Sequence, residues 1–189
     1  MRQKREGDVG EQLDMFATRK PAVVTPPDGV LRSAVLSPCG VYRYDLQRRW
    51  DDGLCVVWVM LNPSTADADA DDPTIRKVVG FTKRWGGGAI RVLNLYAFRA
   101  TDPDDLVRAA KAGVDIVGPE NDAHLRRVLD ENVQVFAAWG GNAKDTARIA
   151  QVRTIAKSTA TTLRCLGHTR GGQPRHPLML AYTTPTEGV

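Results

Sequence analysis

The chain is short of cysteine and of long apolar stretches. Its 3 cysteines in 189 residues, Cys39, Cys55 and Cys165, lie far apart and form no Cys-x-x-Cys pair. An odd number of scattered cysteines argues against a disulfide framework or a zinc site and favours a reducing compartment. No apolar run approaches the ~20 residues that span a bilayer, and the charged N-terminus lacks the apolar segment of a secretory signal. We therefore expect a cytoplasmic protein without a membrane partner.

A strong charge bias is also lacking. Lys and Arg number 26 and Asp and Glu 22, which leaves a net charge of +4, and 42% of the residues are hydrophobic. These values are ordinary for a globular protein, and the length fits one domain with a tail to spare. The small positive excess permits a nucleic-acid partner without requiring one.

Large apolar residues are sparse in the first 28 residues, which mix charges with Gly and Pro. This composition cannot bury enough surface to offset the entropy of ordering, so we expect a disordered tail over 1–28 and a single α/β domain over 29–189. One tail segment resembles the peptide by which bacterial replication and repair proteins dock on the sliding clamp: Gln12, Leu13, Asp14, Met15 and Phe16. The resemblance implies the clamp as a partner, since Leu, Met and Phe can fill apolar pockets.

Continuous apolar runs indicate a buried sheet. They cover about residues 56–61, 90–93, 135–138 and 163–166, with helical patterns between them. Because such runs are typical of strands covered on both faces, we predict a central, mostly parallel, four-stranded sheet. Two further strands around a turn at 37–40 predict an edge hairpin. Asp72 followed by Pro73 predicts the start of the first helix.

Polar side chains follow these strands at their carboxyl ends, where ligands bind in parallel sheets. The candidates for the site are Asn62, Pro63 and Ser64; Asn94, Tyr96, Phe98 and Arg99; Trp139 and Asn142; and His168, Arg170, Arg175 and His176. An amide can hold a water or pair with a base edge, an aromatic ring can stack on a base, and Arg or His can contact a phosphate or a leaving group. Tight turns, core aromatics and an ordinary surface loop are the alternatives for these blocks.

Acidic residues are concentrated after the first buried run, at Asp67, Asp69, Asp71 and Asp72. Carboxylates in this spacing can bind Mg²⁺ or Ca²⁺, but the stretch lacks the glycine and the distal glutamate of a calcium loop. We interpret it as a solvated loop and a helix cap, and we expect neither a metal ion nor an organic cofactor. An acidic loop also repels DNA phosphates, which counts against a DNA substrate.

Five longer motifs resemble the domain of unknown function 1643, a family of bacteria and phages. They are, in chain order, Val41–Tyr44, Leu61–Asp67, Asp71–Arg76, Gly118–Asp122 and Pro174–Leu178. The resemblance covers about residues 30–181 and implies membership of that family. It implies no activity.

The order of the strand-end blocks is also similar to the uracil-DNA glycosylase superfamily, which has a three-layer α/β/α fold. This resemblance implies that Asn62 positions the attacking water and that Asn94 reads the base edge. Trp139-Gly140 and Ala143 resemble the Trp-Gly-x-x-Ala strand end of the superfamily. The loop that contains the histidines would stabilise the departing base and insert into DNA.

The chain departs from the superfamily pattern at two of its motifs. Met60 and Ser64 stand where glycines are expected, and Met60 is bulky enough to crowd the pocket. There is no His-Pro-Ser run, so either His168 or His176 could take that place. His176 is preferred because Pro177 follows it and because it lies within one of the five family motifs.

The resemblance implies a nucleobase-acting, glycosylase-like enzyme of DNA repair or phage DNA modification, with DNA as partner and Asn62 and His176 as catalytic residues. Two alternatives stay open: a non-enzymatic binder of damaged or modified DNA, and an enzyme that acts on free nucleotides or sugars. The target base, the strandedness of the DNA and the oligomeric state do not follow from the sequence.

Overall fold

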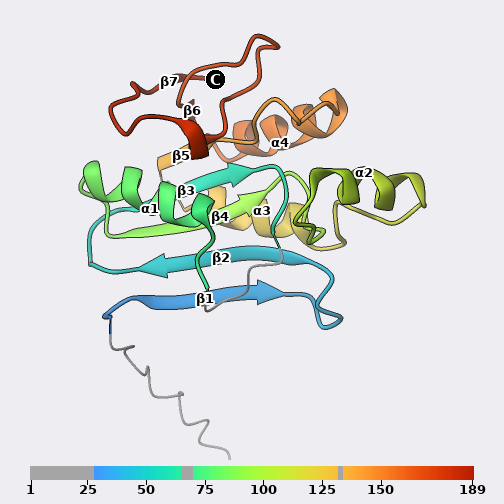
Figure 1. The fold of residues 1–189 in the computed structure, drawn as a ribbon, viewed down its shortest axis with the longest axis horizontal. Helices are drawn as coiled ribbons and strands as arrows, with labels where there is room; N and C mark the ends of the chain where they lie inside the picture. Colours follow the sequence, from blue (N-terminus) through green and yellow to red (C-terminus); the bar gives the residue numbers. More distant parts are fainter. Residues whose placement is uncertain (1–27, 65–69, 132–133) are drawn as a thin grey trace, which may run out of the picture.

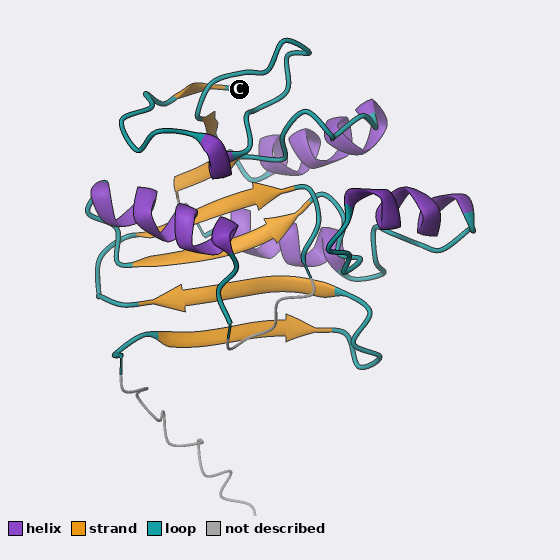
Figure 2. Ribbon diagram, in the orientation of Figure 1, coloured by secondary structure: helices purple, strands orange, loops and turns teal. Residues whose placement is uncertain are grey.

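The computed structural model describes residues 28–64, 70–131 and 134–189, which form one seven-stranded mixed sheet flanked by helices (Figure 1, Figure 2). The strands are β1 (Leu31–Leu36), β2 (Arg43–Arg49), β3 (Cys55–Met60), β4 (Ala89–Asn94), β5 (Gln134–Ala137), β6 (Leu163–Cys165) and β7 (Glu187–Gly188). Their order across the sheet is β1-β2-β4-β3-β5-β6-β7. The strands β4, β3, β5 and β6 pair in parallel, and β1, β2 and β7 are added through antiparallel pairings.

Helices cover both faces of the sheet (Figure 1). On one face lies α1 (Pro73–Arg84), with the 3₁₀-helix η1 (Pro177–Met179) packed beside it. On the other face lie α3 (Asn121–Leu129) and α4 (Thr146–Ser158), and α2 (Pro103–Lys111) adds Leu106 to their core. Alternate residues of β3 serve the two faces, as the two-residue period of a strand requires: Val57 and Val59 pack toward α3 and α4, and Val56 and Trp58 toward α1.

Side-chain caps begin three of these helices, α1, α2 and α4. Asp72 Oδ1 accepts a hydrogen bond from the Ile75 N–H at 2.7 Å, and Pro73 occupies the first turn of α1. Asp145 caps α4 by accepting from the Arg148 N–H at 3.0 Å. Such caps satisfy amide groups that a helix leaves unpaired at its start. The predicted helix start at Asp72 is confirmed.

Buried ion pairs hold β2 in the sheet. Asp45 is fully buried and accepts from Arg91 of β4 at 2.6 Å, while Arg91 also contacts Glu131 at 2.8 Å. Arg48, whose side chain is fully buried, donates from Nε to Asp71 at 2.7 Å. Because a buried charge without a partner costs several kcal/mol, these pairs fix β2 against β4 and against the segment that leads into α1.

The mixed α/β class is confirmed, and so is the edge hairpin of β1 and β2. The sheet is wider than predicted because β7 joins it, and η1 lies in a stretch predicted to be a loop. A strand of two exposed residues carries no apolar period, so the sequence offers no signal for it. No helix in the described ranges is long and apolar enough to cross a membrane.

The chain reverses its direction across the sheet at β3. It passes from β3 through α1 to β4 on one side, and then through α2 and α3 to β5 on the other side of β3 (Figure 1). In open α/β sheets such a reversal leaves a crevice at the carboxyl ends of the strands. The ends of β3, β4 and β5 are Met60, Asn94 and Ala137. Met60, Asn94 and Ala137 therefore lie at the edge of the sheet where such a crevice is expected.

Candidate functional site

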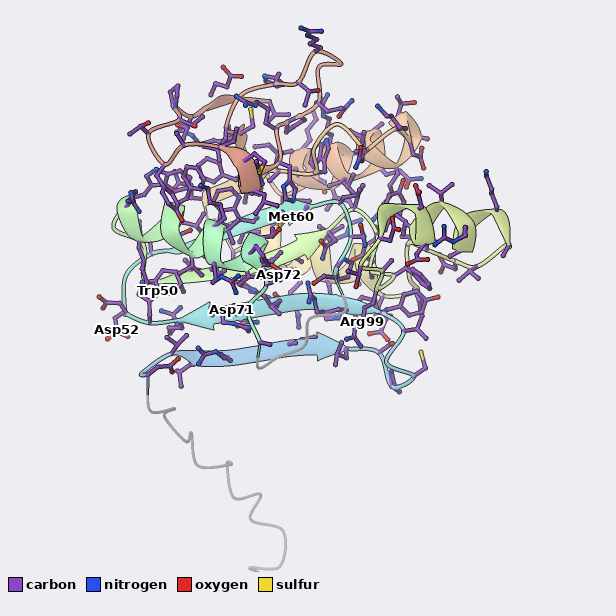
Figure 3. All side chains as sticks on the ribbon, viewed as in Figure 1. Trp50, Asp52, Met60, Asp71, Asp72 and Arg99 are labelled. Atoms are coloured by element: carbon purple, nitrogen blue, oxygen red, sulfur yellow. The ribbon has the colours of Figure 1, made fainter. Side chains whose placement is uncertain are left out.

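A pocket of about 530 Å³ lies at the carboxyl ends of β3, β4 and β5. Further walls come from the start of β2, the first turn of α1 and the segment before η1. Two of its residues, Met60 at the end of β3 and Asp72 at the start of α1, are labelled in Figure 3. Its polar lining residues are Arg43, Asn62, Ser64, Asp72, Thr74, Asn94, Thr101, Asn142 and His176. The volume falls in the range of small-molecule sites.

Asn62 lies in the turn after β3, and the backbone fixes its side chain. Its Nδ2 donates to the carbonyl oxygen of Pro63 at 3.1 Å and to that of Ala100 at 2.8 Å. Both amide hydrogens are thereby used, which leaves Oδ1 as the atom that accepts a hydrogen bond from a pocket occupant. A fixed acceptor of this kind can orient a water molecule.

Asn94 ends β4 and is 2% exposed. Its Nδ2 has no hydrogen-bond partner among the described residues, although it is buried. Its backbone is well held, since Asn121 Nδ2 donates to the Asn94 carbonyl at 3.1 Å and Arg148 Nε donates to the Leu95 carbonyl at 2.7 Å. A buried, unsatisfied amide costs about 1–3 kcal/mol, so a ligand acceptor placed at Nδ2 would remove that cost.

His176 precedes η1, and its Nδ1 accepts from the Leu178 N–H at 3.4 Å. In the neutral ring this leaves Nε2 as the nitrogen that carries the hydrogen and donates. Burial lowers the pKa of His176 below its ordinary 6.5, with the nearby Asp72 opposing, so the ring is neutral at pH 7. The histidine lies against Gly140, where a Cβ would stand 3.0 Å from the His176 Cβ.

Two charged residues of the pocket were not among the site candidates from the sequence: Arg43, and Asp72, which was predicted only as a helix cap. Arg43 is 3% exposed, and burial lowers its pKa to about 10 while Asp72 opposes that shift, so the guanidinium keeps its charge at pH 7. Asp72 Oδ2 accepts from the Ser64 hydroxyl at 2.9 Å. The available signal for Arg43 was its place in the Val41–Tyr44 motif.

Trp139 and Asn142, which follow β5, also line the pocket as the strand-end pattern predicts. Trp139 is 1% exposed and donates from Nε1 to Gln173 Oε1 at 2.9 Å, which joins the end of β5 to the loop before η1. Pro63 is buried outside the pocket lining, and its carbonyl accepts from the Ala100 N–H at 3.0 Å. Pro63 therefore shapes the turn that presents Asn62.

The aromatic segment after β4 lies away from the pocket. Tyr96 is buried, and its hydroxyl donates to Asp145 Oδ2 at 3.2 Å; burial and this carboxylate raise the pKa of Tyr96 to about 12. Phe98 packs against the core beneath α3 and α4. Arg99, labelled in Figure 3, donates from Nη1 to the Gly40 carbonyl at 3.0 Å. The structure gives these three side chains contacts within the fold rather than positions in the pocket.

The loop 167–176 divides the predicted basic residues. His168, Arg170 and Arg175 are exposed and do not line the pocket, whereas His176 does. Of the two histidines considered for the leaving-group position, His176 is the one at the site. The segment Gln12–Phe16 and the residues Asp67 and Asp69 lie outside the described residues, and Asp71 pairs with Arg48.

Comparison with known proteins bears on the family rather than on the activity. One solved structure to which the chain is similar is a hetero-hexameric glutamate dehydrogenase from Thermus thermophilus in its leucine-bound form, at 15% identity and a TM-score of 0.30. The match covers 69% of this chain and 30% of that one, and a likeness this weak indicates neither fold nor function.

No curated protein matches the chain. The model of a family described as "Protein of unknown function (DUF1643)" matches residues 43–178. That range includes the pocket residues from Arg43 to His176. The chain therefore belongs to the DUF1643 family of proteins of unknown function.

Proposed function

We propose that the protein hydrolyses the bond between a nucleobase and its sugar, with DNA as the substrate. The observation that carries the proposal is the meeting of Asn62, Asn94 and His176 in one pocket. The resemblance to the uracil-DNA glycosylase superfamily implies the roles of water positioning, base reading and leaving-group stabilisation for these residues. The pocket is large enough for an extruded nucleotide, because sites for small molecules start at about 300 Å³.

In this reaction a water oxygen bonds to the anomeric carbon, the carbon–nitrogen bond breaks, and the base leaves with the bonding electron pair. Asn62 Oδ1 accepts a hydrogen bond from the water and directs it at the carbon. An amide is too weak a base to remove the proton, so Asn62 contributes orientation. The proton passes to solvent, or to the base, once the new carbon–oxygen bond has formed.

The departing base carries negative charge, and the pocket offers two donors for it. The neutral His176 donates from Nε2, and the buried guanidinium of Arg43 supplies a positive charge in a region of low dielectric constant. Preorganised groups of this kind act on the charge that develops in the transition state. Asn94 Nδ2 donates to a carbonyl on the base edge and thereby selects the base.

Two features support DNA as the form in which the base arrives. Met179 is 90% exposed and adjoins Leu178, which lines the pocket. An apolar side chain there can fill the gap that an extruded nucleotide leaves in the stack. The clamp-like segment Gln12–Phe16 would bring the enzyme to replicating DNA.

Arg43 favours a second candidate as well, an enzyme or binder for free nucleotides. A buried guanidinium in a pocket suits a phosphate, which it can bind through two hydrogen bonds. The two candidates differ in what raises the melting temperature: free nucleotides under the second, and DNA with the target base under the first. A non-enzymatic DNA binder would show the DNA effect without releasing a base.

The test incubates the full chain with oligonucleotides that contain uracil, deaminated, oxidised or hypermodified bases, followed by hot alkali to break the strand at abasic sites. Asn62→Ala is expected to lower the rate of strand breakage about 10²–10³-fold, as the loss of one positioned polar group does in other active sites. Thr162→Ala, an exposed change at the amino end of β6, is the control and retains the rate.

Because Asn62 also bonds to two carbonyls, the melting temperature of each variant must be measured beside the rate. A folded Asn62→Ala protein with full activity would contradict the role of this residue. Absence of base release from every oligonucleotide, with stabilisation by free nucleotides, would replace the proposal with the second candidate.

A further inference from the structure

Three side chains with metal-binding atoms meet at the edge of the sheet, at the base of the loop 167–176. Cys165 ends β6, His168 is the second residue of the loop, and Glu187 lies in β7, which pairs with β6. Their sulfur, ring nitrogen and carboxylate oxygen lie within 4.8 Å of one another. Two strands and the loop that carries His176 are thus joined at one point outside the pocket.

The distances are close to those around a zinc ion. Cys165 Sγ lies 4.0 Å from His168 Nδ1 and 4.0 Å from Glu187 Oε1, and the same Nδ1 lies 2.6 Å from that oxygen. Donors on a tetrahedral zinc ion, with bonds of about 2.0–2.3 Å, lie about 3.3–3.8 Å apart. The Glu187 side chain is 53% exposed and can turn its carboxylate away from the ring. Small rotations therefore place all three donors around one ion.

An ordinary ion pair accounts for only part of this cluster. The ion pair explains the contact between His168 and Glu187, but it does not involve the Cys165 thiol. The Cys165 sulfur also lies 3.8 Å from the Gly188 carbonyl oxygen, and at 3.8 to 4.0 Å it makes no strong hydrogen bond to that carbonyl, to His168 or to Glu187. Thiolate, imidazole and carboxylate are together the ligands of a borderline-soft divalent cation, zinc above all.

We propose that Cys165, His168 and Glu187 bind a zinc ion, with water as the fourth ligand. The scattered cysteines argued against a zinc site at the level of sequence, because the third ligand comes from β7, a strand without a sequence signal. The site is separate from the pocket, and the proposal does not depend on the glycosidic reaction.

The ion would cross-link β6, β7 and the start of the loop 167–176. β7 pairs with β6 at only two positions, and the loop closes through a hydrogen bond from the Arg175 N–H to the Gly167 carbonyl at 2.9 Å. A metal bond to Cys165, His168 and Glu187 adds a strong link across both. It would hold the segment that presents His176 to the pocket.

The test adds zinc chloride to the full chain after treatment with a chelator, and cobalt chloride in parallel. We expect one equivalent of zinc to bind and to raise the melting temperature by about 5–10 °C when free zinc is about 100 times the Kd. Cobalt is expected to give the near-ultraviolet absorption of a thiolate–cobalt bond. If zinc does not raise the melting temperature and cobalt does not produce this absorption, the proposal is overturned.

Variants separate this site from zinc bound elsewhere. Cys165→Ser and Glu187→Gln are each expected to weaken zinc binding at least about tenfold, whereas Cys39→Ser, at an exposed cysteine, leaves it unchanged. Glu187 is exposed, so Glu187→Gln stays folded even where a change at the buried Cys165 does not. Binding that is equally tight in folded Glu187→Gln and in the original protein would overturn the assignment.

Discussion

The sheet has a hollow at each end of its parallel strands. The larger hollow contains no buried polar or charged residue, whereas the smaller one does. At the amino ends of β5 and β6 lies a hollow of about 690 Å³, against about 530 Å³ for the pocket at the carboxyl ends. The larger one is lined by Thr161, Thr162, Arg164 and others, none of which is a buried polar or charged residue. The pocket contains Arg43, which is 3% exposed, and Asn94, which is 2% exposed.

This difference indicates which hollow is built for a ligand. Burial of a charge or of an unpaired amide costs free energy, and a fold keeps such groups where they have a partner or a task. Arg164 instead lies exposed and donates to the Thr186 hydroxyl at 2.6 Å. Volume alone favours the amino ends of the strands, whereas buried polar atoms favour the carboxyl ends.

Substitution of the arginine in each hollow should give the largest difference in the rate of base release. Arg43→Gln is expected to lower kcat/KM for base release about 10²–10³-fold, because the positive charge that faces the departing base is lost. Arg43→Lys should recover part of this loss, since the charge returns without the planar fork. Arg164→Gln, the matched change, should leave the rate as it is. Equal effects of Arg43→Gln and Arg164→Gln would remove the distinction between the two hollows.

A glycine pair tests the contact that positions His176. Gly140 and Gly172 both have positive φ, at +77° and +73°, but only at Gly140 does a Cβ meet another group, His176. Alanine should cost both sites about 1–2 kcal/mol of unfolding free energy from the left-handed backbone. Gly140→Ala should cost about 1–3 kcal/mol more through the close contact. Chemical denaturation measures both, and base release should fall for Gly140→Ala alone. A loss of the same size in both variants would show that the contact does not matter.

The smallest effect concerns pH. Burial depresses the pKa of His176 in the folded protein, so its contribution to stability is complete above the ordinary pKa of 6.5 and is lost as pH falls through the folded value. Burial also lowers the pKa of His124, so the comparison must be between the original protein and His176→Gln. The variant should lose less stability between pH 8 and pH 5. An identical loss in both proteins would contradict the assignment.

The rule that ligands bind at the carboxyl ends of parallel strands predicted part of the pocket lining. Asn62, Asn94, Trp139 and Asn142 meet because parallel strands end at one edge, whatever their separation along the chain. His176 joins them through the loop, whose position depends on contacts such as the bond from the Gly140 N–H to the Pro174 carbonyl at 2.9 Å. Such a long-range contact produces no periodic pattern in the sequence, so sequence analysis does not predict it.

The sequence analysis missed Arg43 and misplaced Tyr96, and each error has a structural cause. Arg43 starts β2, which runs antiparallel to β4, so its amino end lies beside the carboxyl ends of the other strands. The rule considers only the carboxyl ends of strands, so it does not identify Arg43, which lies at an amino end. Tyr96 was predicted to face a base, but its partner is Asp145, which lies 49 residues later and caps α4. Local pattern does not distinguish an aromatic residue in the core from one in a pocket.

An amide-to-acid change in each hollow tests the central claim, that the buried amide at the carboxyl ends reads a base. Asn94→Asp replaces the unpaired donor Nδ2 with an acceptor, and Gln134→Glu makes the same change on an exposed residue of the other hollow. The measurement is the rate and identity of free base released from the oligonucleotides, read by mass spectrometry. We predict that Asn94→Asp loses about 10²-fold in rate or releases a different base, and that Gln134→Glu behaves as the original protein does. A folded Asn94→Asp protein that releases the same base at the original rate would contradict the account.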